Sequence, residues 1–234
     1  QLMKRMGLYN VDKRFPGDSP EKELIQRFIQ TRCINRKERK VIMPMIDLLN
    51  HSPSAKPYEM PEAGIAVSGL HDGEVLVKYS VSDPMRRLLG YGFNAPEPLG
   101  FSIFLRLQHR DQKVVVQGGG GRQPMKPCSI ELKDDVVVLQ QPLLAASMRP
   151  KMPRTLFIQA CRNVEGIDAN ELFDQVHQRN TQSLVQLMRE LDGVEGDVAQ
   201  RLRTGCLDQL AALSDHIGQR DDIRNNQTAQ AEAA

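Results

Sequence analysis

The sequence has few cysteines, and none is placed as a metal or disulfide site would need. Four cysteines occur in 234 residues, with no Cys-x-x-Cys pair among them: Cys33, Cys128, Cys161 and Cys206. Because structural zinc sites and disulfide frameworks depend on close or regular cysteine spacing, the sequence favours neither. We expect the four to be small buried side chains in a reducing compartment.

Long apolar runs and an excess of one charge are also missing. The apolar stretches fall far short of the ~20 residues that a membrane-spanning helix needs. The amino end lacks the charged-then-apolar pattern of an export signal. With 31 basic and 29 acidic side chains, the formal net charge is only +2, so the chain has no surplus that attracts a polyanion. We therefore expect a soluble, cytoplasmic protein whose partners include neither nucleic acid nor a membrane.

The glycine run "QGGGG" at 117–121 is too incomplete to be a phosphate-binding loop. That chemistry needs a following Lys-Ser/Thr pair and the start of a helix, and both are missing here. The run predicts a flexible hairpin loop instead.

Helix and strand signals divide the chain into two halves. Ser19 and Pro20 precede "EKELIQRFIQTR", which predicts a capped helix over about 20–32 with Leu24, Ile25 and Phe28 on its apolar side. The polar segment 35–40 indicates a connection, and 41–46 a short buried strand. The pattern then predicts one or two helical turns in "PMRRLLGYGF" and strands at 64–69, 73–80, 101–107, 113–117, 128–132 and 135–140. Asp134 and Asp135 predict a turn.

Beyond about residue 142 the apolar period becomes helical. Apolar or buried-type residues recur at three- and four-residue steps in two series: Phe173, Val176, Asn180, Leu184, Leu187 and Leu191, then Val198, Leu202, Leu210, Leu213 and Ile217. The segment Gly193–Gly196 predicts the turn between two antiparallel helices. The remaining histidines are expected at the surface; they are His71, His109, His177 and His216. The last dozen residues, "IRNNQTAQAEAA", are expected to fray.

Two motifs carry the strongest functional signal. "DLLNHS" at 47–52 contains the pair Asn50-His51, and "YGF" at 91–93 places Tyr91 41 residues after Asn50. "TRCINR" precedes them with two arginines. This ordered set resembles the SET-domain methyltransferases, in the branch that contains the plant Rubisco large-subunit lysine methyltransferase. The resemblance covers about 20–106, and the helical half looks like the substrate-binding domain of that branch.

The resemblance implies an α+β fold. A SET-domain β-fold of small sheets, with a helical insert and a pseudoknot formed by the strand that carries Tyr91, would precede a mostly α-helical C-terminal domain. The family's glycine-rich cofactor motif is not found, so we expect the first part of the SET fold to be missing. The implied divisions are a helical insert segment (1–36), the C-terminal part of the SET domain (37–106), a β-hairpin linker region (107–141), a helical substrate-binding-like domain (142–220) and a flexible tail (221–234).

The resemblance also implies roles for individual residues. S-adenosylmethionine would be held at Asn50, His51, Arg32 and Phe93. The channel for the substrate lysine would be lined by Arg36, Asp47, Tyr58 and Tyr79. Tyr91 would place its hydroxyl beside the transferred methyl group, as the catalytic residue. Where relatives have a Ser-Asn pair and an acidic helix residue, this chain has Asp83-Pro84 and Arg86-Arg87.

The chemistry fits these residue types. Methyl transfer needs an aligned amine lone pair, so the protein contributes mainly placement and electrostatics. Because free lysine has a pKa near 10.4, presenting its neutral amine at pH 7 costs about 5 kcal/mol unless burial beside a cation lowers that pKa. Tyrosine rings and hydroxyls suit such a site. We expect an S-adenosylmethionine-dependent protein-lysine N-methyltransferase whose partner is a protein presenting a lysine.

Other interpretations stay open. Tyr79 and Tyr91 are alternatively core tyrosines at strand ends, and Arg32 and Arg36 alternatively cap the carboxyl end of their helix. A relative of the same branch would methylate histidine. A non-catalytic SET-like module would bind peptides without the cofactor, and a truncated scaffold would do neither.

Overall fold

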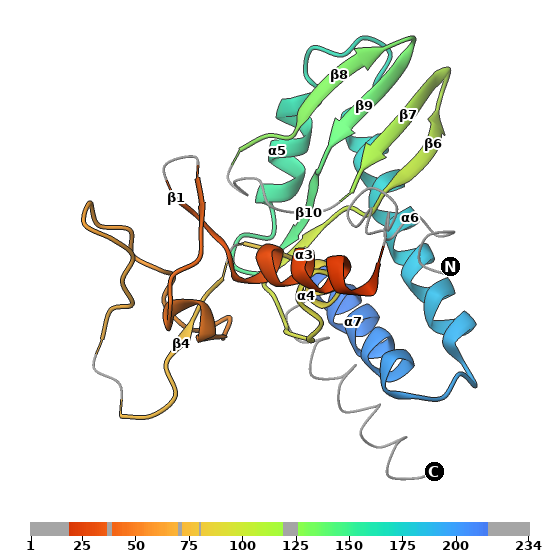
Figure 1. The fold of residues 1–234 in the computed structure, drawn as a ribbon. Coiled ribbons are helices and arrows are strands. Elements are labelled where there is room, and N and C mark those ends of the chain that lie inside the picture. Colours follow the sequence, from red (N-terminus) through yellow and green to blue (C-terminus); the bar gives the residue numbers. More distant parts are fainter. Residues whose placement is uncertain (1–18, 37–38, 70–71, 80, 119–125, 215–234) are drawn as a thin grey trace. The chain divides into compact units, whose positions relative to one another are not determined.

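The chain forms two compact units, described by a computed structural model (Figure 1). The boundary between them falls between residues 80 and 81, inside the 37–106 segment that the sequence assigned to one domain. We call them the N-terminal unit, described from residue 19 to 79, and the C-terminal unit, described from 81 to 214. Both contain helices and small sheets, which makes the chain α+β. The described residues are 19–36, 39–69, 72–79, 81–118 and 126–214.

A four-stranded sheet forms the centre of the C-terminal unit. β7 and β9 run parallel in its middle, and each has an antiparallel neighbour on its outer side. The spatial order is β6 (Leu105–His109), β7 (Gln112–Gln117), β9 (Val136–Gln140) and β8 (Ser129–Lys133). β7, β8 and β9 confirm the sequence prediction, and so does the turn at Asp134 and Asp135, whose φ angles are +49° and +61°. The single strand predicted at 101–107 is wrong, because its ends belong to two strands in different sheets, Leu99–Phe101 and Leu105–His109.

One predicted hairpin is wrong. β9 lies between β7 and β8 in the sheet, so the connection that follows β7 joins two strands that do not pair with each other. The "QGGGG" segment therefore does not close a hairpin. Its residues beyond Gly118 lie outside the described part of the chain.

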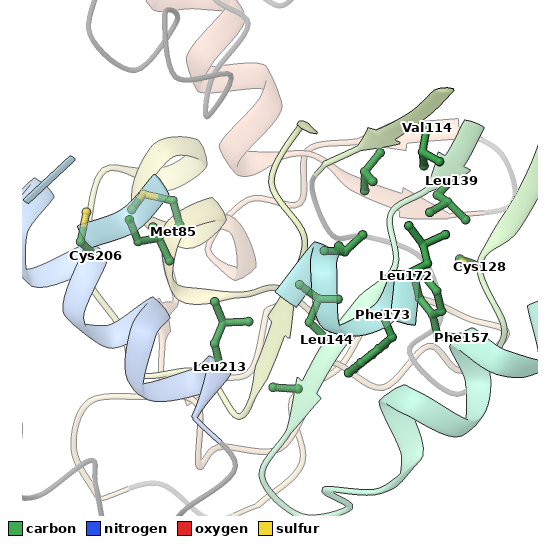
Figure 2. Close-up of a cluster of buried hydrophobic side chains, with 14 of the residues drawn as sticks. Met85, Val114, Cys128, Leu139, Leu144, Phe157, Leu172, Phe173, Cys206 and Leu213 are labelled. Carbon is green, nitrogen blue, oxygen red and sulfur yellow. The ribbon is translucent and has the colours of Figure 1, made fainter. Parts of the chain in front are cut away.

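Helices α5 (Met152–Cys161) and α6 (Ala169–Leu191) share one core with the sheet (Figure 2). The strand register places Val114 opposite Val137 and Val116 opposite Leu139, so these four side chains point to the same face. They belong to one buried cluster with Phe157, Cys161, Leu172, Phe173 and Val176 of the two helices. The six positions of α6 that the sequence predicted to be buried are all buried.

The rest of the C-terminal unit packs around α7 (Asp197–Leu213). This helix follows the turn at Gly193–Gly196, where both glycines have positive φ, and contacts α6, α4 (Pro84–Tyr91) and a second small sheet. That sheet pairs β5 (Leu99–Phe101) with β10 (Leu143–Ala146) in antiparallel fashion. β10 lies beyond residue 142, where the sequence predicted only helices.

Three further predictions about this unit need correction. Val198 was placed on the buried side of its helix, but it lies in the first turn of α7 with 71% of its surface exposed. His109 was expected at the surface, but it is fully buried: its Nε2 accepts the N–H of Asp168 at 3.2 Å, and its Nδ1 lies 3.0 Å from Gln175 Oε1. His177 is half-buried and donates from Nε2 to the Leu213 carbonyl at 2.9 Å.

The N-terminal unit begins with the predicted helix α3 (Pro20–Arg32). The hydroxyl of Ser19 accepts the N–H of Lys22 at 3.3 Å, and Pro20 occupies the first turn, which confirms the predicted cap. The predicted polar connection at 35–40 is wrong for its described residues, because 35–36 belong to β1 (Ile34–Arg36) and 39–40 to β2 (Arg39–Val41), which pair in antiparallel fashion.

The predicted buried strand at 41–46 is also wrong. Only Val41 belongs to a strand, Ile42 and Met45 are exposed, and a 3₁₀ turn, η1 (Ile46–Leu48), follows. Asn50 and His51 form a strand of their own: β3 (Asn50–His51) pairs in parallel with β4 (Leu76–Val77). The 64–69 segment forms only one bridge, between Ala66 and Glu59. His71, His216, Ile217 and the predicted tail at 221–234 lie outside the described residues.

Candidate functional site

Six of the predicted site residues meet around one short segment of the N-terminal unit. The segment is 46–51, which contains η1 and β3. Asp47, Asn50 and His51 belong to it, and side chains from elsewhere in the unit bond to it. Those side chains are Arg32, Tyr58 and Tyr79.

Arg32 connects the end of α3 to η1. It is the last residue of the helix, and its Nη1 donates a hydrogen bond to the main-chain carbonyl of Asp47. The described bond therefore crosses to another element instead of capping α3, whose carboxyl end is closed by the N–H of Cys33 bonding to the Ile29 carbonyl at 3.0 Å. Arg36 lies in β1, and its side chain is outside the described part.

Two phenols hold the carbonyls of the same segment. The Tyr58 hydroxyl donates to the Ile46 carbonyl at 3.3 Å, and the Tyr79 hydroxyl donates to the Leu49 carbonyl. Met45, which directly precedes the segment, has a φ of +72°, an unfavourable backbone conformation for a residue with a side chain. Such a conformation persists only where surrounding contacts hold it. The hydrogen bonds from Arg32, Tyr58 and Tyr79 to carbonyls of the segment supply such contacts.

The strand β3 brings Asn50 and His51 beside the chain that leads to Tyr79. His51 Nδ1 accepts the N–H of Tyr79 at 3.1 Å, and the two rings lie 5.1 Å apart at 45°. This bond requires an unprotonated Nδ1. The amide of Asn50 donates to Glu74 Oε1 at 2.6 Å. In the described residues, β3 has one strand neighbour, β4, so its second edge carries no strand.

The remaining predicted residues, Tyr91 and Phe93, belong to the C-terminal unit. Tyr91 is the last residue of α4, so the expectation that it lies on a strand is wrong. The helix ends because Gly92 adopts a left-handed conformation with φ +82° and donates its N–H to the Leu88 carbonyl at 2.8 Å. Phe93 follows directly, and its ring centre lies 6.1 Å from that of Tyr91.

Two buried acidic side chains, Glu97 and Asp83, bond to residues of α4. The guanidinium of Arg87 is fully buried and contacts Glu97 Oε1 through Nε at 2.9 Å and Nη2 at 2.7 Å. At the other end, the Asp83 carboxylate caps the helix by accepting the N–H of Arg86 at 2.7 Å. Burial raises the pKa of Asp83 to about 6.

Sequence reasoning missed Glu74 and Glu97. Both act through partners that only the fold brings close: Asn50 lies 24 residues before Glu74, and Arg87 lies 10 residues before Glu97. The signal available for Glu97 was an arginine on the apolar side of a short helix, since a buried guanidinium needs an acidic partner.

Three of the four cysteines are buried thiols. Cys128, Cys161 and Cys206 are buried as predicted, whereas Cys33, which was also expected to be buried, is partly exposed. Burial raises the pKa of Cys161 and of Cys206 to about 12. Thiols with such values are not nucleophiles at neutral pH. Across the described ranges, no group of three or more His, Cys, Asp or Glu side chains is suited to hold a metal ion. Nor does any described helix have the length and apolar character needed to cross a membrane.

Comparison with known proteins adds no assignment. No family model matches the chain, and no curated protein or solved structure matches it.

Proposed function

We propose that this chain is part of a SET-type methyltransferase that transfers a methyl group from S-adenosylmethionine to a lysine of a protein substrate. The observation that carries the proposal is the gathering of Arg32, Tyr58 and Tyr79 around the segment 46–51, which contains Asp47, Asn50 and His51. The resemblance implies a site role for each of these residues, and the three side chains come from distant points of the chain.

The cofactor would bind at β3 of the N-terminal unit. There the main chain of Asn50 and His51 would hold the adenine ring, next to the pairing with β4. Arg32 is fixed by the Asp47 carbonyl through one N–H, and a guanidinium has further donors for a carboxylate. S-adenosylmethionine, when bound, supplies an activated methyl group on its sulfonium sulfur.

The chain's own residues would orient the acceptor and exclude water. Tyr58 and Tyr79 are half-buried, and their rings are held by bonds from their hydroxyls. Aromatic walls of this kind lower the cost of an uncharged amine and tolerate nearby positive charge. Tyr91 would accept a hydrogen bond from the amine, and the fold as a whole would be a cytoplasmic SET domain followed by a helical substrate-binding domain.

Cofactor binding tests the proposal directly. Isothermal titration of the full-length protein with S-adenosylmethionine should give heat of binding. Arg32→Ala should weaken the affinity by about tenfold, because a charge-assisted hydrogen bond is lost. Lys22→Ala is the matched control, since it removes an exposed cation from the same helix and should leave the affinity unchanged. Absence of any heat from the wild-type protein would reject the enzyme and leave a peptide-binding module.

The acceptor residue needs its own measurement. A peptide array that presents lysines in varied sequences, incubated with the protein and isotopically labelled S-adenosylmethionine, should become labelled. Fragment mass spectrometry of the labelled peptides should locate the methyl group on lysine. A label found on histidine would assign the other activity of the same branch.

A further inference from the structure

A buried arginine contacts the ring of Tyr91. Arg87 lies one helical turn before Tyr91 on α4, and its guanidinium carbon is 5.1 Å from the centre of the tyrosine ring. Residues four positions apart are neighbours on a helix surface, and a cation over an aromatic face is attracted to it. The attraction is stronger here because the Arg87 side chain has no exposed surface.

Glu97 fixes that arginine from the other side. Its Oε1 accepts from both Nε and Nη2 of Arg87, and its own side chain is only 2% exposed. Glu97 lies between Pro96 and Pro98, whose rings restrict the backbone that carries it. The guanidinium is therefore held between a carboxylate and the Tyr91 ring.

The main chain after Tyr91 is held separately. Arg201 of α7 donates from Nη1 to the Gly92 carbonyl at 2.9 Å, and the Asn94 amide donates to the Arg201 carbonyl at 2.9 Å. These contacts fix the backbone of the "YGF" motif but not the direction of the tyrosine ring. Arg87 and Tyr91 both belong to α4, so the contact between the guanidinium and the tyrosine ring is made inside one helix.

We propose that Arg87 is a positioning residue for Tyr91, with Glu97 fixing the guanidinium and the guanidinium fixing the ring. The catalytic meaning of this arrangement rests on the proposed function, in which Tyr91 contacts the methyl acceptor. A purely stabilising role explains the pair poorly, because apolar replacement of a whole buried ion pair is often neutral or favourable for stability. Placement of the tyrosine accounts for a charged pair at this point.

The test observes the Tyr91 ring without relying on activity. The full-length protein is labelled with 3-fluorotyrosine, and the fluorine signal of Tyr91 is assigned with Tyr91→Phe. Arg87→Lys and the double variant Arg87→Met/Glu97→Leu should each move this signal, with melting temperatures of the double variant close to wild type. Arg86→Met, one position away on the same helix, is the control and should leave the signal in place.

Two outcomes decide the proposal. A Tyr91 signal that stays at its wild-type position in both the folded Arg87→Lys and the folded double variant overturns it. A moved Tyr91 signal in either variant, together with an unmoved signal in Arg86→Met, supports the proposal. Arg87→Lys keeps the positive charge, which gives it the best prospect of folding.

Activity then separates this proposal from the proposed function. With an active wild type, kcat should fall by about tenfold to a hundredfold in Arg87→Lys, because small misplacements of a reacting group cost that much. The KM and the affinity for S-adenosylmethionine should stay near wild type. An inactive wild type with a moved fluorine signal rejects the methyltransferase but retains the Arg87–Tyr91 positioning. An active wild type with an unmoved signal retains the methyltransferase but rejects the Arg87–Tyr91 positioning.

Discussion

The phenol hydroxyl of Tyr79 donates a hydrogen bond to the main-chain carbonyl of Leu49, thirty residues earlier in the chain. The same residue donates its own N–H to His51 Nδ1. Tyr79 thus holds the segment before β3 with its side chain and the strand itself with its backbone. The half-buried tyrosine is more than core filling, because its polar atoms define the position of the candidate cofactor edge.

Tyr79→Phe should loosen the 46–51 segment. Removing the hydroxyl leaves the Leu49 carbonyl without this donor, which should lower the free energy of unfolding by about 1 kcal/mol. Hydrogen exchange of the amides in 46–51 should become faster, and the affinity for S-adenosylmethionine should fall. The measurement is exchange followed by mass spectrometry, together with titration calorimetry.

Tyr58→Phe is the matched control for that experiment. Its hydroxyl donates to the neighbouring Ile46 carbonyl, but at 3.3 Å, near the upper limit of a hydrogen bond. We expect a smaller change in exchange than for Tyr79→Phe. Equal exchange in wild type and Tyr79→Phe would show that the hydroxyl does not hold this segment.

The stability of the C-terminal unit should depend on the protonation of Asp83. Burial raises the pKa of this carboxyl from 3.8 to about 6, against the opposing effect of its hydrogen bond from the Arg86 N–H. A raised native pKa means that the native state binds the proton more tightly than the unfolded state. The stabilising contribution is therefore complete below pH 3.8 and is lost as pH rises through 6.

Asp83→Asn should remove this pH dependence. Asparagine still caps a helix but carries no charge to bury. The stability difference between variant and wild type should change by about 2 kcal/mol between pH 4 and pH 7, with the variant gaining as pH rises. Urea unfolding at several pH values measures it. A difference that is constant with pH would rule out the buried carboxylate as its source.

Asp168 provides a contrast of opposite sign. Its carboxylate caps α6 by accepting the N–H groups of Asn170 and Glu171, both at 3.1 Å, and these bonds lower its pKa. Its contribution is therefore present at neutral pH and lost in acid. Asp168→Asn should not reproduce the gain at neutral pH that we expect for Asp83→Asn.

Gly205 should be intolerant of a side chain. A Cβ at this position of α7 would lie 2.6 Å from Leu88 Cδ2 and 3.3 Å from Asn94 Nδ2, so α4 and α7 pack too closely to accept it. Gly205→Ala should lower the free energy of unfolding by up to about 2 kcal/mol, because the ~1–3 kcal/mol cost of overpacking is offset in part by the ~1 kcal/mol better helix propensity of alanine. Chemical unfolding measures the change.

Gly90→Ala is the control for Gly205→Ala. Gly90 lies inside α4, and no atom lies within 4 Å of a Cβ built there. Alanine is the better helix former by about 1 kcal/mol, so this variant should be more stable than wild type. If Gly205→Ala also proved stabilising, the close approach of the two helices would not limit this position.

The sequence predicted best where the determinants are local. The Ser19 cap and Pro20 specify where α3 begins, and the three- and four-residue apolar steps specify the buried side of α6. The prediction of a buried strand at 41–46 was wrong, because an apolar run does not reveal whether other residues cover it. In the structure, Ile42 and Met45 are exposed.

In the candidate site, too, the residues set by a local motif were predicted and those placed by the fold were not. Asn50 and His51 were found from a motif, but their strand β3 exists only through pairing with β4, some 26 residues later. The partners Glu74 and Glu97 were not found, because the fold and not the local sequence places them. The expected adjacency of Tyr91 to Asn50-His51 stays a prediction.

Asn180 supplies the last prediction, since a polar residue occupies a position of the apolar series of α6. It is fully buried: its Oδ1 accepts the N–H of Ile103 at 2.7 Å, and its Nδ2 donates to Ser102 Oγ at 2.9 Å and to the Val176 carbonyl at 2.7 Å. Asn180→Leu satisfies the helical pattern but removes the acceptor of the Ile103 N–H and the donor to the Ser102 hydroxyl, which keeps its own bond to the Ile103 carbonyl. We therefore expect it to lower the free energy of unfolding by about 2–4 kcal/mol, despite the more apolar side chain. Leu184→Met, a neighbouring buried position of the same helix, should cost less than about 1.5 kcal/mol. Equal stabilities of the two variants in chemical unfolding would show that the amide does not hold the 102–103 segment against α6.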